Sequence, residues 1–345
     1  MDKKQRINAF VKCGLFIKKH FNLTEWSENE KALHEGLNYL IETAYTFNGW
    51  FTKEFVQESL LNLAEMLDSK SVEKFAEHIQ EPSKAKTVTV IMAGNIPLVG
   101  FHDLMCVLLS GNKVLIKMSS DDNVLMPYFI KLLAFYEPEI SELISFSEGK
   151  LSDFDAVIAT GSDNSSQYFE YYFGKYPHII RKNRTSIAVL TGNESQEDLQ
   201  KLGKDIFLYF GLGCRNVSKL LVPQGYNFDK LFESVFDYKF VVNNKKYGNN
   251  YDYNRTVYLL NGEKFLDNNF LIIKEDNGLF SPVSVLFWQE YKDQSGLKAY
   301  INENRDLIQC IVGSGAGYVP FGYSQLPVIT DYADGVNTLD FLVNL

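Results

Sequence analysis

Apolar residues in the first part of the chain recur with the period of an amphipathic helix. Positions 7, 10, 11, 15 and 16 are apolar, and this i, i+3, i+4 spacing places them on one helical face. The same spacing returns over 33–41 and over 60–67. We therefore predict helices up to about residue 85, followed by a polar connector over 81–86.

Beyond the connector, short β-branched runs alternate with helical stretches. Strands are predicted over 87–92, 113–117, 155–159, 186–190 and 219–222, and helices over 101–110, 125–136 and 197–210. Such alternation favours a parallel sheet covered by helices. Further strands are predicted over 256–260, 270–273, 284–288 and 308–312. The segment 243–254, rich in Asn, Tyr and Lys, is predicted to be a polar loop.

These elements predict an α/β protein of two domains with a boundary near 183–186. Residues 1–185 would form a helical N-terminal region and a nucleotide-binding α/β domain. Residues 186–318 would form a second α/β domain, and 319–345 a C-terminal tail. A junction between two such halves is a favoured place for a ligand cleft.

Composition narrows the class of protein. The 345 residues are 46% hydrophobic and 22% charged, which excludes wholesale disorder. With 34 basic and 43 acidic residues, we expect neither nucleic acid nor an anionic membrane surface as a partner. Lysines interrupt the apolar positions of the first segment, and no apolar run reaches the ~18–20 residues of a membrane span. We expect a cytoplasmic protein without a signal peptide or membrane span.

The four cysteines form no CxxC pair and no zinc-type cluster with histidine, so we expect reduced thiols and no metal. Cys13, Cys106 and Cys310 lie in apolar runs and are predicted to be structural. Cys214 follows Gly211 and Gly213, between a predicted helix and a predicted strand. Glycines allow a sharp turn there, which is a suitable place to present a nucleophile. These features alone still favour a structural cysteine over a reactive one.

Five stretches, in order, resemble motifs of the aldehyde dehydrogenase superfamily, and more narrowly its acyl-CoA reductase branch, known from bacterial bioluminescence systems. Residues 93–97 resemble the motif of the oxyanion-binding Asn, and 110–117 a strand whose Lys reaches the adenosine ribose. Residues 159–162 resemble a turn beside the cofactor pyrophosphate. Residues 211–214 resemble the Gly-x-x-Cys of the nucleophile, and 279–283 the segment E-x-F-x-P-V. The first 85 residues match no motif.

The resemblance implies an aldehyde dehydrogenase-like fold, with a Rossmann-type NADP-binding domain and a catalytic domain that carries Cys214. It implies Cys214 as nucleophile and Asn95 as oxyanion donor. The implied cofactor-binding residues are Lys117, Ser120, Thr160, Gly161, Ser162 and Phe280.

Three departures from the family pattern bear on the chemistry. Arg181 stands where hydrolysing members hold the Glu that activates water, which a reductase of thioesters does not need. Gly278 stands where members of the family hold a Glu that binds the nicotinamide ribose. Ser120 replaces a ribose-binding Glu of NAD-preferring members, and removing a carboxylate that would repel a 2′-phosphate favours NADP.

The expected reaction is the NADPH-dependent reduction of an acyl-CoA to an aldehyde through an acyl-cysteine. One alternative is an acyl-phosphate reductase of the same superfamily. Another is a catalytically silent NADP-binding protein, which Gly278 favours. If hydrolysis does occur, Glu275 or Asp276 is the nearest replacement for the absent Glu. An acyl-activating synthetase is a partner implied by the resemblance alone, and a homo-oligomer stays open.

Several candidates also have a purely structural interpretation. Asn95 before Ile-Pro is typical of a turn. Lys117 is typical of a solvated lysine at the end of a strand, and residues 160–162 are typical of a helix N-cap. For each of these three motifs taken alone, the structural interpretation is favoured. When the motifs are considered together with Cys214, in their order along the chain, a functional role is favoured. The basic cluster Arg181, Lys182 and Arg184 is either a counter-ion for phosphates or a solvated face.

Overall fold

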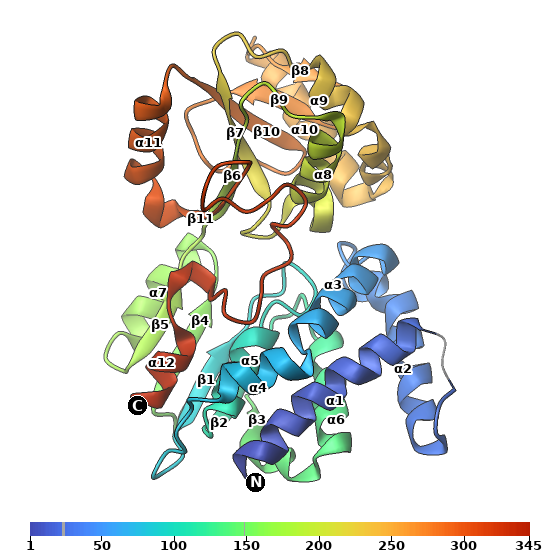
Figure 1. The fold of residues 1–345 in the computed structure, drawn as a ribbon, viewed down its shortest axis with the longest axis vertical. Coiled ribbons are helices and arrows are strands. Elements are labelled where there is room, and N and C mark those ends of the chain that lie inside the picture. Colours follow the sequence, from blue (N-terminus) through green and yellow to red (C-terminus); the bar gives the residue numbers. More distant parts are fainter. Residues whose placement is uncertain (23–24, 148) are drawn as a thin grey trace. The chain divides into compact units, whose positions relative to one another are not determined.

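The computed structural model describes residues 1–22, 25–147 and 149–345 (Figure 1). The chain forms two compact units. Unit 1 comprises Met1–Lys182 together with Val328–Leu345, and unit 2 comprises Asn183–Pro327. Each unit contains a largely parallel sheet with helices packed around it. The α/β class predicted from the sequence is confirmed.

Unit 1 begins with four helices, as the apolar spacing predicted. They are α1 (Lys3–Phe21), α2 (Glu28–Phe47), α3 (Lys53–Met66) and α4 (Ser69–Ala76). Helix α1 packs against α3, α4 and the later helix α6 (Leu125–Tyr136). Phe10 and Phe16 of α1 are almost fully buried in the core that these helices share with the sheet.

The sheet of unit 1 has five parallel strands in the order β3-β2-β1-β4-β5. The strands are β1 (Thr87–Ile91), β2 (Lys113–Lys117), β3 (Ile144–Phe146), β4 (Ala156–Thr160) and β5 (His178–Arg181). They are connected by α5 (Phe101–Leu109), α6, η1 (Pro138–Leu143) and α7 (Asp163–Phe173). The strand order reverses between β1 and β4. In open α/β sheets, ligands bind at the carboxyl ends of the strands at such a reversal.

The last residues of the chain, Val328–Leu345, belong to unit 1. They contain η5 (Ala333–Gly335) and α12 (Thr338–Val343), and α12 packs against α5. Asn112, just before β2, donates to the carbonyl oxygen of Leu342 at 3.2 Å. The C-terminal segment is therefore anchored to the sheet of unit 1 and is part of its packing.

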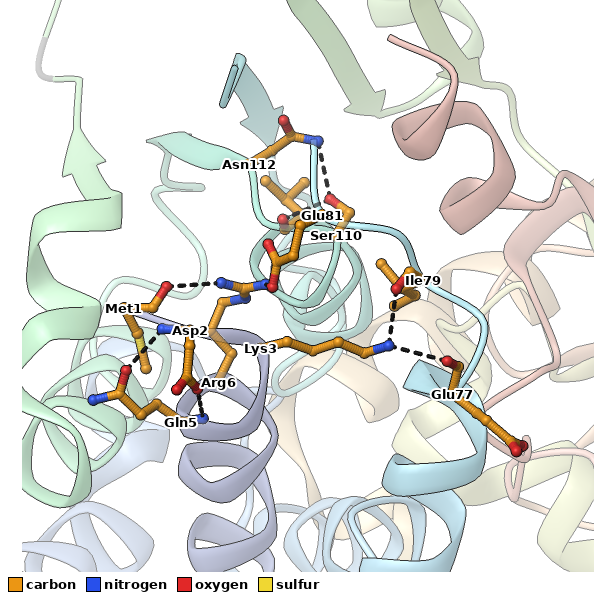
Figure 2. Close-up of polar contacts among 11 residues, drawn as sticks. Met1, Asp2, Lys3, Gln5, Arg6, Glu77, Ile79, Glu81, Ser110 and Asn112 are labelled. Atoms are coloured by element: carbon orange, nitrogen blue, oxygen red, sulfur yellow. Dashed lines mark hydrogen bonds and ion pairs between the residues drawn. The ribbon is translucent and has the colours of Figure 1, made fainter. Parts of the chain in front are cut away.

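Figure 2 shows how the start of α1 is fixed to the connector that leads into β1. The Lys3 ammonium donates to the carbonyl oxygens of Glu77 and Ile79, at 3.0 and 2.8 Å. The buried Arg6 guanidinium pairs with Glu81 at 2.5 Å. These contacts lie before the amino end of β1, so they stabilise the fold at the edge opposite to the carboxyl ends of the strands.

Unit 2 has a six-stranded sheet in the order β11-β6-β7-β10-β9-β8, parallel except for the β8–β9 pair. Its strands are β6 (Thr185–Val189), β7 (Val217–Pro223), β8 (Leu266–Asp267), β9 (Ile272–Glu275), β10 (Val285–Tyr291) and β11 (Ile308–Val312). Its helices are α8 (Gln196–Phe207), η2 (Leu208–Gly211), α9 (Asp229–Ser234), η3 (Phe236–Asn243), α10 (Lys245–Leu260), α11 (Gln294–Glu303) and η4 (Arg305–Leu307). In Figure 1, α11 lies on one side of this sheet and α8, α9 and α10 on the other.

Two predictions were wrong, and helix α10 replaces both. The predicted polar loop 243–254 and the predicted strand 256–260 form this one helix. The Asn244 side chain caps it by accepting from the backbone N–H groups of Lys246 and Tyr247, at 2.9 and 3.2 Å. Tyr247, Tyr251 and Asn254 are its buried positions, and their i, i+4, i+7 spacing is that of a helix.

Candidate active site

Most of the predicted site residues of unit 1 come together at one edge of its sheet. Lys117 ends β2 and Thr160 ends β4, with Gly161 and Ser162 following directly. Asn95 and Ser120 lie in the loops after β1 and β2, and both side chains are exposed. Because β2, β1 and β4 are parallel neighbours, their carboxyl ends share an edge, at the point where the strand order reverses.

The loop that carries Asn95 is fixed by neighbouring polar groups. Leu98 adopts a left-handed backbone conformation with φ 59°, and its N–H donates to the Asp122 carboxylate at 3.0 Å. The hydroxyl of Ser59, on α3, donates to the carbonyl oxygen of Pro97 at 3.0 Å. Asp122 is buried, and burial raises the pKa of its carboxyl group. Asp122 thus holds the loop in place, and nothing in the sequence had singled it out.

Two glycines on either side of the reversal leave no room for a side chain. A Cβ at Gly94 would lie 2.6 Å from the Ser119 hydroxyl, and one at Gly161 would lie 2.8 Å from the Cβ of Ser165. Both turns therefore need glycine. Ser162 caps α7 by accepting from the N–H of Ser165 at 3.3 Å, as its structural interpretation predicted. A glycine turn that opens a helix at a strand reversal fits the close backbone approach of a phosphate group.

Cys214 lies in unit 2 and its side chain is exposed, whereas Cys13 and Cys106 are buried and Cys310 is half-buried. The chain reaches Cys214 through a left-handed turn. Tyr209, Phe210 and Gly211 have φ values of 54°, 57° and 76°. Left-handed backbone at a bulky residue costs on the order of 1–3 kcal/mol, and burial of both aromatic rings offsets this cost. Such strain is concentrated at functional sites.

The loop of Cys214 is also held by side-chain hydrogen bonds. The Asn216 side chain accepts from the N–H of Gly213 at 2.8 Å and donates to the carbonyl oxygen of Leu208 at 2.8 Å. The Ser186 hydroxyl, on β6, donates to the carbonyl oxygen of Cys214 at 3.0 Å. The thiol is therefore presented to solvent from a loop of fixed geometry. Asn216 follows Cys214 closely in the sequence, but only the fold shows what it binds.

Phe280 is also in unit 2 and is 39% exposed. Just before it, Gly278 donates its N–H to Asp276 at 2.8 Å, and a Cβ at Gly278 would lie 3.2 Å from the same carboxylate. The other oxygen of Asp276 accepts from the Lys274 ammonium at 2.7 Å. Burial raises the pKa of Asp276, but these hydrogen bonds outweigh it and lower the pKa. Asp276 is thus engaged in structure, and Glu275, at the end of β9, is exposed.

The two interpretations of Arg181 as a phosphate counter-ion or a solvated residue were both wrong. Its side chain is buried and pairs with the carboxylate of Asp103, on α5. It also donates to the hydroxyls of Thr338 at 2.9 Å and Thr160 at 3.5 Å. A buried charge requires such a partner. Arg181 therefore connects the end of β4 with the C-terminal helix α12.

Two further features are absent from the part of the chain that the structure describes. No group of three or more His, Cys, Asp or Glu side chains is arranged to hold a metal ion there. In the same residues, no helix combines the length and the apolar character needed to cross a bilayer.

Comparison with known families decides the assignment. The model of the acyl-CoA reductase LuxC matches residues 6–231, which is more than half of the chain. The chain belongs to the LuxC acyl-CoA reductase family. The resemblance inferred from the five motifs is thereby confirmed. The range matched by the LuxC family contains Asn95, Lys117, 160–162 and Cys214, while Phe280 lies beyond it. No curated protein matches the sequence significantly.

Solved structures confirm the aldehyde dehydrogenase fold expected for this LuxC family member. Aldehyde dehydrogenase 21 from Physcomitrella patens, in complex with succinate, superimposes with a TM-score of 0.66 at 12% identity, over 100% of this chain and 84% of that one. An NAD-dependent aldehyde dehydrogenase from Sinorhizobium meliloti gives 0.65 at 12% identity, over 95% and 73%. An NADP dependent enzyme from E. coli gives 0.61 at 12% identity, over 87% and 75%. Membership of the LuxC family, together with this fold, supports an oxidoreductase of acyl or aldehyde groups.

Proposed function

We propose that this protein reduces an acyl-CoA to an aldehyde. In the balanced reaction, acyl-CoA, NADPH and a proton give the aldehyde, free CoA and NADP⁺. The observation that carries the proposal is Cys214, an exposed thiol on a strained and tightly held loop, in a chain of the LuxC family. Cysteine suits a two-stage acyl transfer because its thiolate is both a strong nucleophile and a good leaving group.

In the first stage, the Cys214 thiolate attacks the thioester carbonyl carbon. The carbonyl oxygen becomes negatively charged, and we assign its stabilisation to the Asn95 side-chain amide and the backbone N–H of Cys214. Losing one such donor typically costs about 3 kcal/mol of the barrier. The C–S bond to CoA then breaks, CoA leaves as a thiolate that takes up a proton, and the acyl group stays on Cys214.

In the second stage, NADPH, when bound, supplies hydride to the acyl carbon. The same two donors stabilise the oxygen again, and the bond to Cys214 breaks to release the aldehyde. We assign binding of the dinucleotide to unit 1, where Lys117, Ser120 and the turn 160–162 would hold it, and we assign Phe280 of unit 2 as a further cofactor-binding residue. The glycine turns at the strand reversal support this assignment. The exposed, neutral Ser120 favours NADP over NAD.

We propose that the acyl group on Cys214 reacts with hydride or with CoA and resists hydrolysis by water. Arg181, at the position of the hydrolytic Glu, is neutralised by Asp103. Asp276, one possible substitute in unit 2, has both carboxylate oxygens in hydrogen bonds. Activation of water needs a carboxylate or imidazole placed as a base. We also propose that an acyl-activating synthetase supplies the acyl groups, as in the bioluminescence systems from which the family is known.

The test is an assay of NADPH oxidation with acyl-CoAs of several chain lengths, run beside acyl phosphates and NADH. We expect turnover of at least one acyl-CoA, with aldehyde as product, and none in the Cys214→Ser variant. The Cys13→Ser variant, at a buried cysteine of unit 1, is the matched control and should retain its specific activity. If only acyl phosphates were turned over, the substrate would be an acyl phosphate and not an acyl-CoA. Full activity in Cys214→Ser would reject the mechanism.

A further inference from the structure

Lys219 is a fully buried lysine in β7, a central strand of the unit 2 sheet. Its ammonium contacts three oxygens. They are the carbonyl oxygens of Asp276 and Gly278, at 2.7 and 3.1 Å, and the side-chain oxygen of Gln289, at 3.0 Å. An ammonium group has three N–H donors, so every donor of Lys219 has a partner inside the protein.

Burying an ammonium group is unfavourable unless its hydrogen bonds are satisfied. Here the compensation comes mainly from the backbone of one segment. The neighbouring residue of β7, Ser218, adds to it by donating its hydroxyl to the carbonyl oxygen of Leu279 at 2.6 Å. Two consecutive side chains of β7 therefore bind three carbonyl groups within 276–279.

The segment 276–279 lies between the end of β9 and the start of β10 and has no strand of its own. The N–H of Asp276 donates to the carbonyl oxygen of Trp288, on β10, at 3.1 Å, and Leu279 is buried. Together with these two features, the contacts of Lys219 and Ser218 fix the position of the segment relative to β7. The segment leads directly into Phe280, whose ring is partly exposed. At its other end, β7 begins shortly after Cys214. Lys219 thus connects the strand after the nucleophile with the segment that presents Phe280.

We propose that Lys219 is a positioning residue that fixes the Phe280 segment for the reduction step. It acts through the backbone of Asp276 and Gly278 and does not touch the substrate, because its side chain is fully buried. The resemblance implies that Gly278 stands where the aldehyde dehydrogenase superfamily holds a ribose-binding Glu. No side chain at Gly278 can bind the ribose. The fixed backbone there compensates by holding Phe280, the proposed cofactor-binding residue, in one place. This role rests on the proposed function, since it concerns the same reaction.

The role predicts a selective loss. In Lys219→Met, acylation of Cys214 by acyl-CoA without NADPH should stay close to the wild-type rate. Aldehyde formation should fall by about tenfold to a hundredfold, the usual cost of a small misplacement of a reacting group, and KM for NADPH should rise. Lys219→Gln, which keeps two donors, should lie between Met and wild type and serves if the Met variant does not fold. Lys298→Met, at an exposed lysine of α11, is the matched control.

A second readout needs no turnover. Hydrogen–deuterium exchange over 275–281 should be faster in Lys219→Met than in wild type and in Lys298→Met. Exchange at wild-type rates over this segment would overturn the proposal. So would an equal fall of acylation and aldehyde formation, which would show a general structural role. If the wild type proves inactive on acyl-CoA while the exchange of 275–281 rises in the variant, the proposed function fails and the positioning of the segment stands.

Discussion

At the scale of single residues, two side chains carry the proposed chemistry. Cys214 and Asn95 are both exposed, yet each belongs to a loop whose backbone is held by buried polar groups. Asp122 holds the first loop, and Asn216 and Ser186 hold the second. Fixed donors and nucleophiles lower a barrier because no reorganisation is needed during the reaction.

Replacing Asn95 by Ala should lower the turnover of acyl-CoA by about 100-fold or more, because its amide acts on the developing oxyanion. The affinity for NADPH should change little. Steady-state kinetics with acyl-CoA, combined with a fluorescence titration of NADPH, measures both quantities. A variant that is only less stable, with normal specific activity in its folded fraction, would return Asn95 to its interpretation as a turn residue.

Lys219 should give the protein a distinctive dependence of stability on pH. Burial lowers its pKa from 10.5 to about 8, although the charge of Asp276 raises it in part. Between these two values the unfolded chain binds more protons at this site than the folded protein. The contribution of Lys219 to the free energy of unfolding therefore rises with pH from about 8 upwards, by at most about 1.4 kcal/mol per pH unit.

Denaturant unfolding between pH 8 and 9.5 measures this contribution. The difference in unfolding free energy between wild type and Lys219→Met should increase with pH over that range. Taking the difference removes the titration of other groups that both proteins share. A difference that stays constant, or that decreases, would contradict a lowered pKa of Lys219.

At the scale of elements, the turn before Cys214 should be sensitive to its backbone. Gly211 has a φ of 76°, and L-residues pay roughly 1–2 kcal/mol in this region. Gly211→Ala should therefore lower the thermal stability and slow the acylation of Cys214. Gly225→Ala is a close control, because Gly225 has a φ of 71° and nothing within 4 Å of a Cβ. Equal acylation rates in the two variants would show that the turn does not position the thiol.

Elements with a clear period were predictable from the sequence, and those defined by tertiary contacts were not. Strands such as β1 and β2, and helix α6, match their predicted ranges closely because apolar patterning determines them. Helix α10 was missed because its buried stripe consists of Tyr247, Tyr251 and Asn254, which composition alone assigns to a loop. The predicted strand over 256–260 relied on its β-branched residues, but Leu259 and Leu260 are exposed on the last turn of α10.

The candidate site was predictable only as far as motifs mark it. Asn95, Thr160 and Cys214 stood out through neighbouring Gly, Pro or Ser residues. Asp122 and Lys219 did not, because their role arises from contacts with segments distant in the sequence. Arg181, the last residue of β5, was misinterpreted for the same reason, since its partner Asp103 lies in α5, far from it in the sequence.

At the scale of the whole molecule, the account predicts how the reverse reaction depends on CoA. Aldehyde and NADP⁺ should give acyl-CoA when CoA is present and little free acid when it is absent, because no carboxylate stands at position 181 to activate water. Chromatographic analysis of the products, with and without CoA, checks this. Free acid formed without CoA at a comparable rate would make the protein a hydrolysing aldehyde dehydrogenase.

The central claim is that an acyl group passes through Cys214, and intact-mass measurement tests it most directly. The protein is incubated with a panel of acyl-CoAs while NADPH is withheld. The account predicts a mass increase of one acyl group that maps to Cys214, is absent in Cys214→Ser, and disappears with release of aldehyde when NADPH is added. Absence of an adduct with every acyl-CoA, or an adduct on another residue that is converted to aldehyde, would contradict it.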